Sequence, residues 1–130
     1  MRGRHAGEMV AEIMERARYL DARDRMVFAM LGNKNLSQRE VAQIVGMSES
    51  TLCRRIKRIW RRLDDPMVRA LIEQKGVLRE EFWELAIEHF LHGANAKQLA
   101  EKHRMGVTEV RKVIWLIQGW FKGRQSRGRI

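Results

Sequence analysis

Residues 36–52 have the sequence LSQREVAQIVGMSESTL, and this stretch decides the fold. Ser37 stands three residues before Glu40, the spacing of a capping box in which each side chain binds the other residue's backbone amide at a helix start. The helix that begins there is expected to end near Val45, because Gly46 can adopt a positive φ at little cost. A short, capped helix followed by a tight turn is therefore predicted.

A second helix follows this turn. Met47 is expected to pack inward, and Ser48 is a suitable N-cap for a helix that reaches about Leu63. At about 100° per residue, its apolar residues fall on one side, where they would face the small Ala42 of the preceding helix; they are Leu52, Ile56, Ile59 and Leu63. Two such helices joined by a glycine-containing turn predict a helix-turn-helix over residues 37–62.

The opposite side of the second helix is cationic. Between Ser50 and Leu63 the chain has six cations and no anion. Arginine can bind guanine through two hydrogen bonds, and hydroxyl groups bind bases or phosphates, so this side is suited to the major groove of double-stranded DNA. A merely solvated cationic face is the alternative. The candidate contacts are Ser48, Ser50, Thr51, Arg54, Arg55, Lys57, Arg58 and Arg61, with Arg62 beside them and Arg39 as a further phosphate contact.

The charge of the whole chain points the same way. The 26 Lys and Arg residues exceed the 16 Asp and Glu residues, for a net charge of +10. Such an excess favours nucleic acid, because phosphate contacts release condensed counterions. An anionic membrane surface is the rival partner, but no membrane association is expected, since no apolar run approaches the ~18–20 residues that span a bilayer and the N-terminus does not look like a signal peptide.

The numbers and positions of the cysteine and histidine residues limit which disulfides and metal sites the chain can form. The single cysteine, Cys53, excludes an intrachain disulfide and a multi-cysteine zinc site, and it fits a reducing cytoplasm. His89 and His92 could share a helix face, but without further ligands they are expected to be ordinary histidines. No metal and no cofactor are expected.

The rest of the chain is also predicted to be helical, so the fold class is all-α. The composition has one proline and few β-branched runs bounded by turns. An amphipathic helix over residues 7–20 precedes a helix that Asp21 caps and that ends at residues 32–35. Asp65 and Pro66 then begin a helix that closes at Gly76, and three more are expected over residues 78–92, 96–103 and 107–121. We expect N-terminal helices and the helix-turn-helix in residues 1–64, a second helical unit in 65–122 and a basic tail in 123–130.

The second unit echoes the first at a spacing of 58 residues. The inward positions Val41, Ala42, Met47, Leu52, Ile56 and Ile59 fall on Leu99, Ala100, Met105, Val110, Ile114 and Ile117. Gly46 falls on Arg104, however, and the nearest glycine is Gly106. The second unit is therefore predicted to be a tandem helix-turn-helix with a different turn, lengthened by two residues.

The outward side of this second motif is not cationic. The positions that match the cationic side carry Thr108, Lys112, Trp115, Leu116 and Gly119, with Val113 and Trp120 alongside. An exposed Trp–Leu–Trp surface is a liability on a monomer, which favours packing on the rest of the chain or a homodimer through Trp115, Leu116 and Trp120. Direct reading of DNA and stacking on single-stranded nucleic acid are alternatives. Additional phosphate contacts are possible at its edge, at Arg111, Lys112, Lys122 and Arg124.

Residues 21–63, and above all residues 36–52, resemble region 4 of bacterial sigma-70-family factors. The resemblance covers about a third of the chain. It implies binding of promoter-like DNA through Ser50, Thr51, Arg54, Arg55 and Arg58, and contact with RNA polymerase in the cytoplasm of a bacterial or phage-infected cell. Nothing matches the promoter-melting region of a full sigma factor. The prediction is therefore a sequence-specific transcription regulator with a sigma-like reader.

Two other classes of protein remain open. A phage DNA-packaging protein similar to a terminase small subunit, or an architectural DNA-binding protein, would oligomerise through the C-terminal helices. An enzyme such as a recombinase is not favoured, because the chain has no convincing acidic cluster for two metals and no nucleophile beside a base. The glutamates at 80, 81, 84 and 88 are typical of a solvent-exposed helix face.

Overall fold

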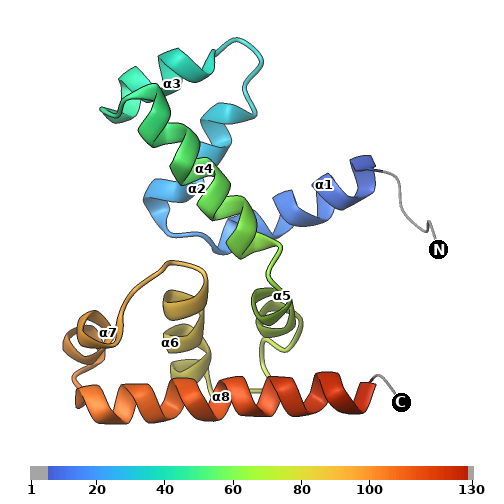
Figure 1. The fold of residues 1–130 in the computed structure, drawn as a ribbon, viewed down its shortest axis with the longest axis vertical. Coiled ribbons are helices and arrows are strands. Elements are labelled where there is room, and N and C mark those ends of the chain that lie inside the picture. Colours follow the sequence, from blue (N-terminus) through green and yellow to red (C-terminus); the bar gives the residue numbers. More distant parts are fainter. Residues whose placement is uncertain (1–5, 129–130) are drawn as a thin grey trace. The chain divides into compact units, whose positions relative to one another are not determined.

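The computed structural model describes the backbone of residues 6–128 and the side chains of residues 11–123. Within this part of the chain every regular element is a helix, which confirms the all-α class (Figure 1). The chain divides between Asp64 and Asp65 into two compact units, an N-terminal unit and a C-terminal unit. The helices are α1 (Ala6–Arg16), the 3₁₀ turn η1 (Ala17–Tyr19), α2 (Ala22–Leu31), α3 (Gln38–Val45), α4 (Glu49–Leu63), α5 (Pro66–Glu73), α6 (Glu80–Phe90), α7 (Ala96–His103) and α8 (Val107–Gly128).

The caps predicted for the N-terminal unit are present. The Asp21 side chain accepts a hydrogen bond from the Asp24 amide at 2.9 Å. Ser37 and Glu40 form both bonds of a capping box, each 3.1 Å long. Gly46 ends α3 with φ 73° and ψ 35°, in the left-handed region that glycine adopts without steric penalty. Caps of this kind stabilise a helix by about 1 kcal/mol each, so they define where these helices begin.

The core of the N-terminal unit lies between α2, α3 and α4. It consists of Val27, Val41, Ala42 and Leu52, all buried, with the flanking Met47 and Ile56 packed against them. Ile59 and Leu63 extend the buried side of α4 toward its C-terminus. The predicted inward stripe of this helix is confirmed, and full burial of each such side chain contributes about 1.5–3 kcal/mol.

Several predicted helix boundaries differ from the structure. The helix expected over residues 7–20 ends at Arg16 and tightens into η1, which buries Ala17 and Leu20 before the Asp21 cap. The helix expected to close at Gly76 ends at Glu73, and Gly76 lies in the following turn with φ 95°. The next helix begins at Glu80 rather than residue 78, because residue 78 lies in a bend and Arg79, the N-cap, has a non-helical ψ of 138°.

The C-terminal unit is built on the same plan as the N-terminal unit. Its core of Leu85, Leu99, Ala100 and Val110, joined by Ile114, repeats the N-terminal core at a spacing of 58 residues. The repeat therefore includes α6, which corresponds to α2, as well as the predicted pair α7 and α8. Within this unit α8 contacts α5, α6 and α7, which lie along one side of it (Figure 1).

The predicted lengthening of the second turn is wrong. Arg104 itself adopts the left-handed conformation of Gly46, with φ 54° and ψ 48°. The Met105 amide donates to the Ala100 carbonyl at 2.9 Å, as Met47 donates to Ala42 at 2.9 Å, and α8 begins 58 residues after α4. A non-glycine residue enters this region at a cost of only about 1–2 kcal/mol, which the hydrogen bond and the packing of the turn can offset.

The predicted end of the last helix at Phe121 is also wrong, because α8 continues to Gly128. The backbone of residues 123–128, expected in a basic tail, is therefore helical. Extending a helix that has already formed requires far less free energy than nucleating one, and Lys, Arg and Gln are good helix formers.

Candidate DNA-binding surface

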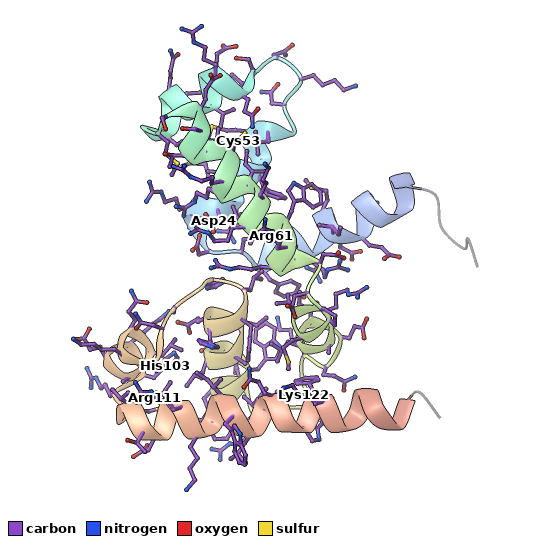
Figure 2. The ribbon with its side chains drawn as sticks, viewed as in Figure 1. Asp24, Cys53, Arg61, His103, Arg111 and Lys122 are labelled. Atoms are coloured by element: carbon purple, nitrogen blue, oxygen red, sulfur yellow. The ribbon has the colours of Figure 1, made fainter. Side chains whose placement is uncertain are left out.

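The candidate contacts lie along α4 on the side opposite the core. Seven of the eight predicted contacts are exposed, as is Arg39 on α3. Figure 2 labels Cys53 and Arg61 along this helix. The exposed cations recur at helical spacing, so they form one continuous face, which we call the α4 face and which consists of Ser48, Ser50, Thr51, Arg54, Lys57, Arg58 and Arg61.

Hydroxyl groups gather at the N-terminal end of the α4 face. Ser48 Oγ accepts from the Thr51 amide at 3.2 Å and donates to Thr51 Oγ1 at 2.8 Å. Ser50 Oγ lies 3.3 Å from Ser48 Oγ. Arg54 Nη2 donates to Thr51 Oγ1 at 3.3 Å, so its guanidinium is held beside the hydroxyls. These groups supply donors and acceptors of the kind that read base edges from the start of a recognition helix.

Arg55 differs from the other predicted contacts. Its Nε and Nη2 lie 2.8 and 2.7 Å from Oδ1 of Asp24, which belongs to α2. The Asp24 side chain is 5% exposed and that of Arg55 is 27% exposed. A buried carboxylate needs such a partner, because an isolated buried charge is strongly unfavourable. The pair therefore fastens α4 to α2, a role for Asp24 that the sequence reasoning missed.

Further along α4 the cations crowd one another. Burial first, and the neighbouring Arg58 cation second, lower the pKa of the Arg62 guanidinium from its ordinary value. A bound polyanion would relieve this repulsion and would pair with the exposed guanidinium and ammonium groups on the same helix. At the end of the helix Arg16 Nε donates to the Leu63 carbonyl at 2.8 Å, which satisfies one of the terminal carbonyl groups.

The corresponding side of α8 has a different chemistry. The positions of Lys57, Arg58 and Arg62 are taken by Trp115, Leu116 and Trp120, which are 71%, 55% and 36% exposed. This exposure excludes burial of Trp115 against the rest of its own unit, which is part of the predicted packing on the rest of the chain. The predicted phosphate contacts Arg111, Lys112 and Lys122 are exposed on α8, whereas the side chain of Arg124 lies outside the described residues.

No helix within residues 6–128 is both long enough and apolar enough to cross a bilayer.

Comparison with known proteins agrees with the geometry of the N-terminal unit. The family model described as Sigma-70, region 4 matches residues 18–65, which include α2, α3 and α4. Comparison with curated proteins found no match, and comparison with solved structures found none either. The matched segment contains the capping box, the turn at Gly46 and the whole α4 face. Residues 18–65 therefore form a helix-turn-helix similar to sigma-70 region 4, a DNA-binding domain.

Proposed function

We propose that the chain is a sequence-specific regulator of transcription that places α4 in the major groove of double-stranded DNA. The observation that carries this proposal is the α4 face: exposed hydroxyls and cations on a helix whose other side is buried in a region 4 fold. A protein of this kind acts where the DNA is, in the cytoplasm of a bacterial or phage-infected cell. We propose a binding role without catalysis.

The contacts divide by their place on the helix. Residues near the start of a recognition helix meet base edges, and those farther along meet phosphates, which fix the register but do not specify sequence. We assign base reading to Ser50, Thr51 and Arg54. Phosphate binding is assigned to Lys57, Arg58 and Arg61, with Arg39 on α3, and Ser48 and Arg55 hold the helix in place.

Selection of bound duplexes from a random pool tests this function. A defined motif should emerge, and binding should weaken by about 10²–10³-fold between 50 and 200 mM salt, as expected for roughly four phosphate contacts. Equal affinity for all duplexes of one length would contradict sequence-specific reading and would leave an architectural protein.

Two partners accompany this proposal. RNA polymerase is one, because residues 18–65 match the family model described as Sigma-70, region 4, and that resemblance implies contact with RNA polymerase. A second copy of the chain is the other, because Trp115, Leu116 and Trp120 form an apolar surface on α8.

The same apolar surface supports a second candidate function, a phage DNA-packaging protein similar to a terminase small subunit. Such a protein grips DNA with its helix-turn-helix and assembles into a ring through its other helices. Light scattering on the purified protein separates the two functions. A monomer or dimer supports the regulator, and a ring of many subunits supports the packaging protein.

A further inference from the structure

The exposed side of α8 combines large apolar side chains with two glycines. We call it the α8 face; it consists of Trp115, Leu116, Gly119, Trp120 and Gly123. A Cβ built on Gly119 or Gly123 would meet no atom within 4 Å. The packing of the chain therefore does not require glycine at either position, although glycine inside a helix is destabilising relative to alanine. Two glycines that the packing within this chain does not require, beside exposed tryptophans, indicate that the backbone of another molecule approaches α8 closely.

The tryptophan and glycine residues are spaced so that the α8 face of one copy can fit the α8 face of another. Trp115 and Gly123 lie four residues on either side of Gly119. If two copies of α8 cross antiparallel at Gly119, the indole of Trp115 in each copy lies against the open backbone at Gly123 in the other. A two-fold axis makes both contacts at once, as an interface between identical surfaces requires. A parallel pair would instead set Trp115 against Trp115 and leave a gap between the glycines.

We propose that the α8 face binds the α8 face of a second copy of this chain, with the two helices antiparallel and crossing at Gly119. This proposal specifies the homodimer named under the proposed function, and it is independent of which DNA α4 reads. The scaffold of the C-terminal unit repeats that of the DNA-binding unit, but the side that reads DNA in α4 has become a surface for self-association in α8.

The area and the charge of the α8 face set the strength of this dimer. At the 71%, 55% and 36% exposure of Trp115, Leu116 and Trp120, these side chains offer about 350–400 Å² per copy. The total area that both copies bury, with the glycine backbone and the lysine stems included, approaches about 1,200 Å², the low end for specific interfaces. A dimer of micromolar affinity is expected. The exposed Lys122 repels its copy, which lies about 9 Å away along the antiparallel helices, so salt should strengthen the dimer while it weakens DNA binding.

Sedimentation of the full chain from about 1 to 300 µM tests the association, a range that spans the micromolar affinity expected for an interface of this size. We expect a monomer–dimer equilibrium whose dissociation constant rises at least tenfold in Trp115→Ala. Val77→Ala is the matched control, since Val77 is 62% exposed in the same unit but lies outside α8. A monomer at every concentration, or a ring of many subunits, would overturn the proposal.

The variant Gly119→Leu tests whether Gly119 serves the dimer interface or the fold of the single chain. Because a side chain at this position meets open space, the variant should fold and melt at or above the temperature of the parent chain, yet fail to dimerise. Its affinity for a single DNA site should stay within twofold of the parent value. Loss of DNA affinity with unchanged sedimentation would mean that the α8 face binds nucleic acid, and would overturn the proposal.

Disulfide trapping tests the orientation in a Cys53→Ser background. Gly119→Cys should cross-link to its copy under oxidised glutathione. Leu116→Cys should not, because residue 116 and its copy would be about 9 Å apart along antiparallel helices, beyond the reach of a disulfide. Cross-linking through Leu116→Cys, whether or not Gly119→Cys also cross-links, would overturn the antiparallel arrangement. The dimer can be present in a chain that reads no specific DNA, so the two proposals fail separately.

Discussion

At the scale of single residues, the two turns show how one backbone conformation is reached by two residue types. Gly46 and Arg104 both lie in the left-handed region, at φ 73° and 54°. Glycine has no Cβ to collide with the neighbouring carbonyl, whereas arginine does, so the C-terminal turn carries steric strain that the N-terminal turn lacks.

Arg104→Gly should stabilise the C-terminal unit by about 0.5–1 kcal/mol, because the relief of strain exceeds the added freedom of the unfolded chain. Gly46→Ala should destabilise the N-terminal unit by about 1 kcal/mol for the opposite reason. Urea unfolding of both variants measures these changes. A loss of stability in Arg104→Gly would show that the arginine side chain contributes more than its backbone strain removes.

The Asp24–Arg55 pair gives a second prediction at this scale. Arg55→Ala leaves a buried carboxylate without its partner, so the free energy of unfolding should fall by about 3 kcal/mol. Arg58→Ala, on the same helix but exposed, should change stability by no more than about 0.5 kcal/mol. Urea unfolding compares the two. An Arg55→Ala variant that keeps its stability but loses DNA affinity would return Arg55 to the set of DNA contacts.

At the scale of elements, α4 is an amphipathic helix whose two sides have separate tasks. One side buries Leu52, Ile59 and Leu63, and the other presents the α4 face. Substitutions on the exposed side should therefore change DNA binding without unfolding the unit, and their effects should differ along the helix.

Arg54→Ala should weaken binding to the selected site by about 1–3 kcal/mol and broaden the bases accepted at one position. Arg61→Ala should weaken binding to all sequences alike and reduce the slope of log affinity against log salt by about 0.9. Fluorescence anisotropy with matched and altered duplexes at several salt concentrations distinguishes them. If Arg54→Ala lowered affinity equally for every duplex, base reading by that residue would be contradicted.

At the scale of the whole molecule, the chain is a tandem repeat of a helical unit with two different outward surfaces. Each unit has its own buried core, centred on Leu52 in one and on Val110 in the other. Because each core is made of residues of its own unit, damage to one core should remain local.

Leu52→Ala should destabilise the N-terminal unit by about 2–5 kcal/mol through lost burial and the cavity that remains. Native-state hydrogen exchange should then accelerate in α2, α3 and α4 and stay slow in α6, α7 and the first half of α8. Val110→Ala should have the reverse effect: exchange should accelerate in α6, α7 and the first half of α8 and stay slow in α2, α3 and α4. Equal acceleration in both units after either substitution would show that they unfold together.

The sequence by itself determined the order of the helices, the caps of α2, α3 and α4, the helix-turn-helix and the 58-residue repeat. These features depend on side chains that act on backbone groups within about four residues, or on apolar periodicity, and both are visible along the chain. Only the tertiary structure decided that Arg55 binds Asp24, that Arg104 makes the second turn without added residues and that Trp115 is exposed. Each of these outcomes depends on which helices pack together, because burial and pairing are properties of surfaces that meet in space.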